Sequence, residues 1–240
     1  MSISILAMIR LFFFTYYIEI IMNIQYYGDY CFKITTKPFG RATEDIVIWT
    51  DPCEKSTGLR APQGQSDIIF LSHTNGVDAE AVGLKGEKIW VNCPGEYAVK
   101  GVNAFGIASY QDEENGALRG ENTIFIFQAE SMNICFLGAL GHDLTPQQIE
   151  KIATVDILFI PVGNHGTLPI KQLDEVIRKI EPVMVIPMHY KMDGMTLDID
   201  DEKAFCAEIG NCPSEKIAKF TIKKKDLENK SMEIVLFDKA

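Results

Sequence analysis

The sequence is poor in the features that mark basic, nucleotide-binding and serine-nucleophile proteins. Its 240 residues carry 23 Lys and Arg against 33 Asp and Glu, so the formal net charge is −10. A surface this acidic repels phosphate backbones, and we expect no nucleic-acid partner. Walker loops, dinucleotide-binding glycine motifs and the Gly-x-Ser-x-Gly turn do not occur in the sequence. Their absence argues against the common nucleotide-binding folds and against serine hydrolases of the α/β type.

The cysteines show no disulfide or zinc-ribbon spacing. None of the six sits in a Cys-x-x-Cys pair: Cys31, Cys53, Cys93, Cys135, Cys206 and Cys212. Several lie in apolar runs, as Cys135 does between Ile134 and Phe136. Cysteine in such a run is typical of a buried, reduced thiol in a reducing compartment. We therefore predict free thiols and a cytoplasmic protein.

The first residues form an apolar stretch whose role the sequence leaves open. Residues 3–22 are almost wholly apolar and aromatic, with Arg10, Thr15 and Glu19 as interruptions. The length approaches that of a membrane span, but an interior charge is costly there, and no small-residue cleavage site follows. Three interpretations stand: an extension ahead of a true start at Met22, a membrane anchor or interfacial segment, and packed structure. We predict residues 1–21 as this segment and 22–240 as one domain, with membrane anchoring as the alternative location.

After Met22, short apolar runs alternate with turn residues, which is typical of strands. Strands are predicted at residues 24–27, 31–35, 46–50, 68–72, 88–92, 97–109 (two strands), 123–128, 133–137, 157–162, 183–188, 220–223 and 233–237. Three helices are predicted, at 146–153, 169–180 and 201–209. Thr145 is suited to cap the first helix and Gly210 to end the third. The first part of the chain is predicted to be mostly strands, and the second part alternates helices with strands. This order implies an α/β fold with helices layered over sheets.

Each histidine of the chain follows an apolar, strand-like run: His73, His142, His165 and His189. Catalytic loops tend to sit at strand ends, and neutral imidazole is the commonest metal ligand. The loop after residues 68–71 holds both His73 and Asp78, which could face a metal or a substrate. The alternative is a hydrogen-bonded loop with a turn at Asn75.

Several short segments, taken together, resemble the metallo-β-lactamase superfamily, in the branch of small Zn-dependent hydrolases similar to ascorbate-phosphate lactonases. They follow the family's order over residues 22–240: Tyr26-Tyr27-Gly28-Asp29-Tyr30-Cys31-Phe32, Asp51-Pro52, Ser72-His73, Pro94-Gly95-Glu96-Tyr97-Ala98-Val99-Lys100-Gly101, Arg119-Gly120-Glu121-Asn122-Thr123, Leu140-Gly141-His142, Pro161-Val162-Gly163 and Ile186-Pro187-Met188-His189-Tyr190. The resemblance implies a four-layer αβ/βα sandwich with a metal site at one edge. Histidine and carboxylate ligands there hold Zn²⁺, which lowers the pKa of a bound water for attack on the substrate.

The sequence departs from the family pattern at most of the positions that the resemblance assigns to metal ligands. In the main loop His73 is retained, and the final His189 is also present. His142 is retained beside the position of the bridging aspartate. The other ligand positions carry Asn75, Val77, Asp78, Gln111 (followed by Asp112), Ala139 and Asp29. Loss of so many ligands predicts that a dinuclear zinc site does not form, since even an outer partner of a ligand affects metal affinity 10–100-fold in typical cases.

The sequence leaves three functions open, and with them the question of whether the chain is an enzyme. The first is a scaffold whose metal site is largely lost, with weak or no hydrolytic activity. It would bind an unidentified small molecule or protein, with a homo-oligomer allowed. The second is a metal-dependent hydrolase of an ester, lactone or phosphodiester with a rearranged mononuclear site. That site would hold one weakly bound Zn or Mn ion on His73, Asp78 and His189, with His73 and Asp78 as catalytic candidates and Asp29, Asp112 and His142 as nearby candidates. Metal-free acid–base catalysis by His73 or His189 is a third reading.

Overall fold

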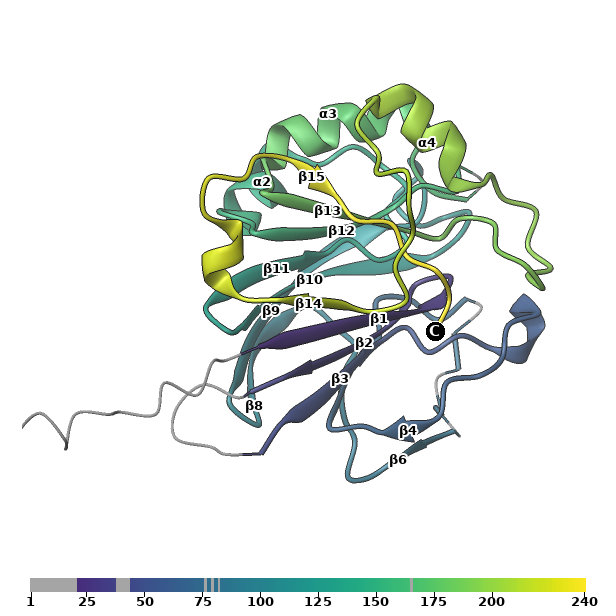
Figure 1. Cartoon of the computed structure of the whole chain (residues 1–240). Coiled ribbons are helices and arrows are strands. Elements are labelled where there is room, and N and C mark those ends of the chain that lie inside the picture. Colours follow the sequence, from purple (N-terminus) through teal and green to yellow (C-terminus); the bar gives the residue numbers. More distant parts are fainter. Residues whose placement is uncertain (1–20, 38–43, 76, 79, 82, 165) are drawn as a thin grey trace, which may run out of the picture.

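Two mixed sheets packed face to face form the body of the protein, as a computed structural model shows (Figure 1). The structure describes residues 21–37, 44–75, 77–78, 80–81, 83–164 and 166–240. The first sheet has the order β14 (Phe220–Ile222), β1 (Met22–Gly28), β2 (Cys31–Thr36), β3 (Ile46–Thr50), β5 (Ile68–Phe70) and β7 (Ile89–Val91). The second has the order β15 (Glu233–Ile234), β13 (Met184–Met188), β12 (Ile157–Pro161), β11 (Met132–Phe136), β10 (Glu121–Ala129), β9 (Val102–Tyr110) and β8 (Gly95–Val99).

Alternation along the strands of the first sheet places apolar side chains on both of its faces. Ile48 and Ile68 belong to the main core, whereas their neighbours Trp49 and Ile69 belong to a second, smaller cluster. Successive strand residues point to opposite faces, so these two clusters lie on the two sides of one sheet. Between the sheets, Phe70 of β5 packs against Phe125 of β10 with ring centroids 5.0 Å apart. Strand β5 and most of β3 are therefore buried on both sides, whereas β1 and β2 are half-buried on their outer face.

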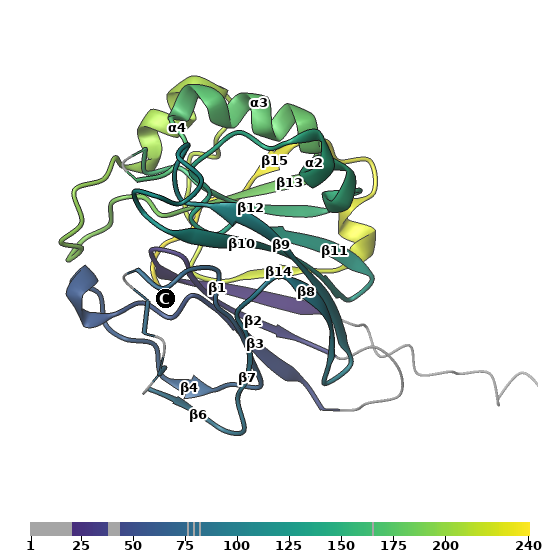
Figure 2. The ribbon, with the colours of Figure 1, turned by 180° about the vertical axis from the view of Figure 1, so that it is seen from behind.

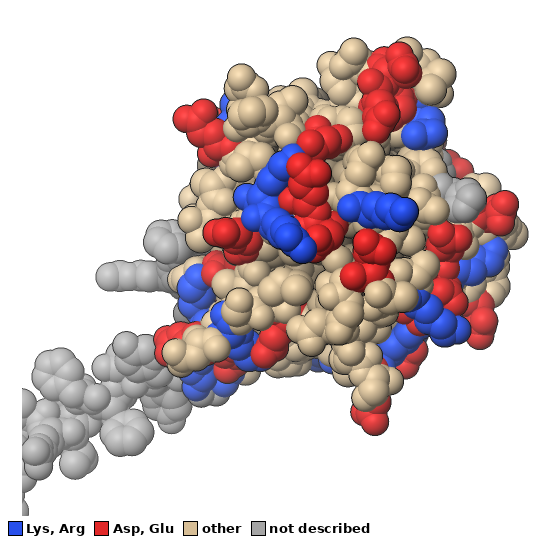
Figure 3. All heavy atoms as spheres, turned by 90° about the horizontal axis from the view of Figure 1, so that it is seen from above, with Lys and Arg blue, Asp and Glu red and all other residues tan. Residues whose placement is uncertain are grey.

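Helices cover the outer face of the second sheet (Figures 1 and 2). They are α2 (Pro146–Ile152), α3 (Ile170–Ile180) and α4 (Glu202–Ile209). Strands β12 and β13 are fully buried because they lie between these helices and the core, as is usual for parallel strands covered on both faces. Seen from the helix side, acidic and basic side chains are interspersed (Figure 3). Ion pairs such as Arg178–Asp174 belong to this face.

The outer face of the first sheet is covered differently. The second cluster is completed by Leu59, Leu84 and Met195, which come from loops and from the short strand β6 (Leu84–Lys85). Strand β6 pairs with β4 (Gly64–Gln65), and the 3-10 helix η1 (Lys55–Thr57) precedes Leu59. Over the described residues this layer consists of loops and short elements. A second 3-10 helix, η2 (Lys224–Leu227), follows β14.

The predicted α/β fold is confirmed, including the helices at 146–153, 169–180 and 201–209 within one residue at each end. Thr145 caps α2 through a hydrogen bond from the Gln148 N–H, and Gly210 ends α4 in the left-handed conformation. Strands β4 and β6 were not predicted, because two-residue strands have no periodicity to detect. The segment 1–21 lies outside the described residues, apart from its last residue. None of the helices in the described part of the chain is long and apolar enough to cross a membrane.

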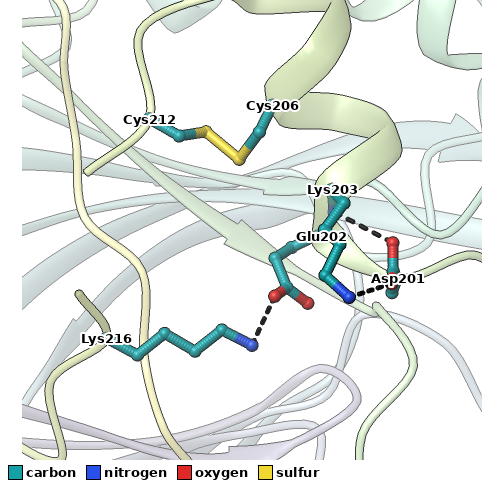
Figure 4. Close-up of a disulfide and its surroundings, with 6 residues drawn as sticks. All are labelled: Asp201, Glu202, Lys203, Cys206, Cys212 and Lys216. Carbon is teal, nitrogen blue, oxygen red and sulfur yellow. Dashed lines mark hydrogen bonds and ion pairs between the residues drawn. A yellow bond between two sulfur atoms is a disulfide. The ribbon is translucent and has the colours of Figure 1, made fainter. Parts of the chain in front are cut away.

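The prediction that all cysteines are free thiols is wrong for two of them. Cys206, in the last turn of α4, forms a disulfide with Cys212 (Figure 4). The left-handed turn at Gly210 reverses the chain directly after the helix, which brings the two sulfur atoms together although no Cys-x-x-Cys spacing announces them. The other four cysteines are free, and Cys31, Cys53 and Cys135 are buried as predicted.

Candidate functional site

His73 lies at the end of β5, where the two sheets are joined by a hydrogen bond. The carbonyl of Ser72 accepts from the Thr123 N–H of β10 at 2.8 Å. Asp51, just after β3, accepts from both the backbone N–H of Ser72 (2.7 Å) and the Ser72 hydroxyl (2.5 Å). Because parallel strands β3 and β5 end at the same edge, Asp51 and His73 meet there. Both residues are buried.

The hydrogen bonds around Ser72 define the orientation of the His73 imidazole. The Ser72 hydroxyl donates its one hydrogen to Asp51, so at 2.8 Å it accepts from Nδ1 of His73. The Nδ1 atom is also 3.5 Å from the Asp51 carboxylate. Nδ1 therefore carries the proton of the neutral ring, and Nε2 keeps its lone pair. Within the described residues Nε2 has no hydrogen-bond partner.

His189 is held in a similar way at the end of β13. Its Nδ1 atom lies 2.5 Å from the carboxylate of Asp29, and its backbone N–H donates to the Asp29 carbonyl at 2.7 Å. The Tyr26 hydroxyl donates to that same carbonyl at 2.8 Å. Asp29 follows β1 of the first sheet, so this contact joins the sheets a second time. The Nε2 atom of His189 again lacks a hydrogen-bond partner among the described residues.

The ring of Tyr30 brings the two histidines into one site. It stacks on His189 with ring centroids 4.3 Å apart and meets His73 edge to face at 4.7 Å. Burial raises the pKa of the Tyr30 hydroxyl well above its usual value, and the charges of Asp29 and Asp51 raise it further. The positive charge of Arg119 opposes them. Tyr30 therefore stays a neutral phenol whose ring occupies space beside both imidazoles.

Three residues of this site hold the backbone in the left-handed region. The φ angles are 56° for Asp29, 32° for Asp51 and 52° for His189. Residues other than glycine adopt such angles at a cost, although Asp and His do so more readily than most. The hydrogen bonds described above hold these residues in place. Strain of this kind often accompanies a functional site.

Asp78 faces a different part of the molecule. Its carboxylate accepts hydrogen bonds from the backbone N–H groups of Glu80 and Ala81, and its own N–H donates to the Pro52 carbonyl. It lines a hollow of about 480 Å³ with Glu54, Lys55, Ser56, Ala61, Gln63 and Gly83. Neither the Asp51–His73 pair nor the Asp29–His189 pair borders this hollow.

Asp112 and Gln111 stabilise the loop after β9. The Asp112 carboxylate accepts four backbone hydrogen bonds, from residues 114, 116, 118 and 119. Burial alone would raise the pKa of this carboxyl, but the four donors favour its charged form and bring the pKa below its ordinary value. Gln111 donates through its side chain to the Glu121 carbonyl at 2.9 Å. Both side chains are thus engaged in holding the loop.

The other residues that the resemblance singles out contact neither His73 nor His189 through a hydrogen bond among the described residues. Val77 and Ala139 are buried hydrocarbon side chains. The amide of Asn75 donates to the Arg119 carbonyl at 2.7 Å. The Nδ1 atom of His142 lies 2.7 Å from the Asp143 carbonyl, and its buried Nε2 has no partner. His165 lies outside the described residues.

The structure thus brings His73, His189 and Asp29 together, with Asp78, Asp112 and His142 engaged elsewhere. Among the described residues no three His, Cys, Asp or Glu side chains gather in a way that could hold a metal ion. The donor set of the described residues therefore falls short of the three protein ligands that a zinc centre needs.

Sequence reasoning did not single out Asp51, Ser72 or Tyr30 as functional residues. Asp51 gave one signal, since it directly follows the apolar strand at residues 46–50 as the histidines follow theirs. Ser72 and Tyr30 lie in segments that carry the family resemblance, but their roles depend on contacts between strands distant in the sequence, which that resemblance did not specify.

Comparisons with known proteins agree with this geometry at the level of the fold. A family model described as "Beta-lactamase superfamily domain" matches residues 23–189. A metal-dependent hydrolase of Listeria welshimeri is 24% identical over 225 residues, covering 82% of this chain and 96% of that protein. One of Bacillus mycoides is 28% identical over 225 residues, covering 80% and 94%.

Solved structures with a similar fold also belong to metallo-β-lactamase-type and metallo hydrolase proteins. A protein of the metallo-β-lactamase superfamily from Thermotoga maritima is similar with a TM-score of 0.70 and 26% identity, covering 90% of this chain and 100% of that one. A metallo hydrolase from Ignicoccus hospitalis is similar in fold, with a TM-score of 0.59 and 15% identity over 92% of this chain and 96% of that one.

Proposed function

Because the chain belongs to the β-lactamase superfamily, as the match over residues 23–189 shows, we propose that it is a member whose hydrolase metal site is largely lost. Its hydrolytic activity is then weak or absent. The scaffold and the two carboxylate–imidazole pairs serve to bind a small molecule or a protein partner instead.

The donor set carries this proposal. Within the described residues no three metal-binding side chains gather anywhere, and Val77 and Ala139 carry no donor atom at all. The carboxylates of Asp78 and Asp112 already accept backbone hydrogen bonds, which a metal ion would have to displace. Imidazole nitrogens from His73 and His189 alone make a poor site, since zinc sites in proteins use three or four protein ligands.

The two imidazoles can nevertheless take part in ligand binding. Each has its Nδ1 fixed against a carboxylate or hydroxyl, so the Nε2 lone pair is held in one direction. Such a nitrogen accepts a hydrogen bond from a ligand hydroxyl or amide, and it can take up a proton. We infer that a ligand carrying N–H or O–H groups binds at this edge.

Metal analysis of the purified chain tests the loss of the metal site. The protein is produced in medium supplemented with zinc and manganese, desalted, and analysed by plasma mass spectrometry beside the Listeria welshimeri relative as a positive control. We expect a substoichiometric metal content in this chain and stoichiometric metal in the relative. A full equivalent of zinc, manganese or iron in this chain contradicts the proposal.

Restoring the family ligands provides the converse experiment. The variant Asn75→His, Val77→Asp, Asp78→His, Gln111→His and Ala139→Asp is expected to gain metal binding in the same analysis. Circular dichroism and thermal melting establish that it folds. If the folded variant binds no metal, the assignment of these positions is wrong.

A second function is favoured by one observation. A metal-ligating histidine usually donates its other ring nitrogen to a carboxylate or similar acceptor, and both His73 and His189 are held in this way. The curated relatives are also named metal-dependent hydrolases. The alternative is therefore a hydrolase of an ester, lactone or phosphodiester with a rearranged mononuclear site that includes these two histidines.

Histidine variants separate the two functions. If the hydrolase exists, His73→Ala and His189→Ala each remove metal binding and hydrolysis, whereas His142→Ala leaves both in place. If the scaffold proposal holds, neither the wild type nor any variant turns over a panel of esters, lactones and phosphodiesters. Metal binding is measured by calorimetry with Zn²⁺ and Mn²⁺.

A further inference from the structure

A disulfide fastens a weakly held segment of the chain to the end of α4. Cys206 lies in the last turn of α4, and Cys212 follows the left-handed turn at Gly210. Residues 211–216 belong to no helix or strand, and among the described residues their backbone groups form no hydrogen bond. The next backbone hydrogen bond along the chain is made by Ile217. The disulfide is therefore a principal attachment of this segment.

Lys216 provides the second attachment of the segment. Its ammonium group pairs with the Glu202 carboxylate at 2.5 Å, and it lies 5.5 Å from the centre of the Tyr190 ring (Figure 4 shows the ion pair beside the disulfide). The Glu202 side chain is only 10% exposed, and a carboxylate that is buried without a partner is costly. Tyr190 directly follows His189. One side chain thus connects the segment to the candidate site.

The segment also borders a hollow of about 690 Å³. Lys216 lines this hollow together with Glu202 of α4 and with Lys191 and Met195 from the loop after β13. That loop begins directly after the strand that carries His189 to the site. Because Lys216 forms part of the wall, a movement of its segment changes how open the hollow is.

The role of this disulfide is local. A domain of this size buries enough apolar surface to be stable without disulfides, and the other four cysteines of the chain are free thiols. Small secreted domains that depend on disulfides show the opposite pattern, with most cysteines paired. Cys206 and Cys212 are half-buried, and their neighbours Ala207 and Pro213 are exposed. A dithiol in solution can therefore reach the bond.

We propose that the Cys206–Cys212 disulfide is a redox-sensitive clasp, which holds residues 211–216 against α4 when closed and releases them when a dithiol reduces it. A thiolate of the dithiol attacks one sulfur, the S–S bond breaks, and the departing cysteine takes up a proton. The second thiol of the reductant loses its proton, attacks the mixed disulfide and displaces the other cysteine. Two electrons thus pass from the dithiol, which becomes a disulfide, to the pair of cysteines. Lys216 then separates from Glu202 and the hollow opens, whether the site binds or hydrolyses its ligand.

Proteolysis of the folded full-length chain tests the clasp. The protein is incubated with and without dithiothreitol, treated with the glutamate-specific protease Glu-C, and followed by mass spectrometry for cleavage after Glu215. Alkylation of acid-quenched samples gives the fraction of Cys206 still linked to Cys212. We expect cleavage to become about tenfold faster or more on reduction, because the segment then opens without a covalent constraint. Cleavage of the reduced protein at the original rate contradicts the clasp, and so does a bond that dithiothreitol leaves closed in the folded chain.

Hydrogen exchange reports on the hollow itself. The Lys191 N–H donates to the Asp200 carbonyl at 2.9 Å, and the Met195 N–H donates to the Met192 carbonyl at 3.1 Å. We expect amide exchange in this loop and in α4 to become faster on reduction, whereas β1 and β2 keep their rates. Equal exchange of the loop in both states would show that the hollow does not respond to the disulfide.

Three variants separate the disulfide from other effects of the reductant. The double variant Cys206→Ser with Cys212→Ser should be cleaved at the fast rate with and without dithiothreitol. Cys93→Ser, which removes an exposed free thiol, should respond as the wild type does. Lys216→Gln keeps the disulfide but removes the ion pair, so the loop after β13 should exchange faster before any reduction. Slow cleavage of a double variant that folds by circular dichroism overturns the proposal.

Discussion

Buried polar side chains at this site act in pairs, and each histidine depends on a partner from another strand. Nδ1 of His189 meets Asp29, and Nδ1 of His73 meets Asp51 through the Ser72 hydroxyl. A buried polar group that loses its partner costs stability, because water cannot replace the lost hydrogen bond. The partners therefore matter to folding as well as to the orientation of the imidazoles.

Asp29→Asn tests the pair at His189. The amide oxygen can still accept from Nδ1, but the charge-assisted part of the interaction is lost. We expect the free energy of unfolding to fall by about 1–3 kcal/mol, measured by urea denaturation. Asp45→Asn is the control, because Asp45 is exposed and pairs with Lys37 on the surface. Its effect should be within about 0.5 kcal/mol, and equal effects of the two variants would contradict the buried pairing.

The variant Asp112→Asn tests whether the Asp112 carboxylate stabilises the loop after β9, through the pH dependence of thermal stability. The folded pKa of Asp112 lies below the unfolded value of about 3.8, so its carboxylate adds stability above that pH. This contribution is lost as the pH falls through the lower, folded pKa. We expect the variant to melt below the wild type at neutral pH, with the difference narrowing in acid. The exposed neighbour Glu113 provides the control variant Glu113→Gln, and a difference that grows in acid would refute the assignment.

Close approach of backbone segments joins the elements at the site edge. Gly138, after β11, adopts φ of +59°, and a Cβ atom there would lie 2.4 Å from both Asn122 Oδ1 and Ser72 Oγ. Asn122 in turn accepts from the Ala139 N–H and donates to the Leu137 carbonyl. Three segments therefore meet closely at Gly138: the end of β11, the start of β10 and the loop that carries His73. No side chain larger than a hydrogen atom fits at this position.

Gly138→Ala is expected to destabilise the fold by about 1–3 kcal/mol from overpacking, in addition to the strain of a positive φ. Gly210→Ala isolates the strain, because Gly210 has φ of +77° but nothing within 4 Å of its added Cβ. The Gly210 variant should cost about 1–2 kcal/mol, because an L-residue in the left-handed region places Cβ close to the following carbonyl. Thermal melts of both variants give the comparison. A smaller effect at Gly138 than at Gly210 would show that the segments can move apart.

The carboxyl-terminal segment connects the two sheets across the whole molecule. Strand β15 joins the second sheet, while the Ala240 N–H donates to the Tyr26 carbonyl of the first. Between these points Phe237 is fully buried and packs against the rings of Tyr26 and Phe32. Its carbonyl accepts from the Tyr190 hydroxyl at 2.8 Å. The last residues thus close one side of the sandwich (Figure 1).

Phe237→Ala tests this closure. Removing a fully buried ring leaves a cavity between the sheets, and we expect a loss of about 3–5 kcal/mol, measured by urea denaturation. Leu118→Ala is the control, because Leu118 is 72% exposed. The control should lie within about 0.5 kcal/mol of the wild type. A similarly small effect at Phe237 would mean that the terminal segment does not contribute to the core.

The sequence alone determined the elements and the α/β class. Apolar runs and turn residues located all the longer strands, and capping residues such as Thr145 and Gly210 located the helix ends, because these signals act between residues close in the chain. It also showed that Val77 and Ala139 stand where the resemblance places metal ligands.

The tertiary structure alone decided which side chains meet. Asp29 and Asp51 became partners of histidines, whereas Asp78 and Asp112, equally plausible ligands by sequence, hold their own loops. The same holds for the cysteines, since Cys206 and Cys212 form a disulfide that no spacing in the sequence announces. Such pairings depend on strand order and on which ends share an edge of the sandwich, and no local pattern in the chain encodes them.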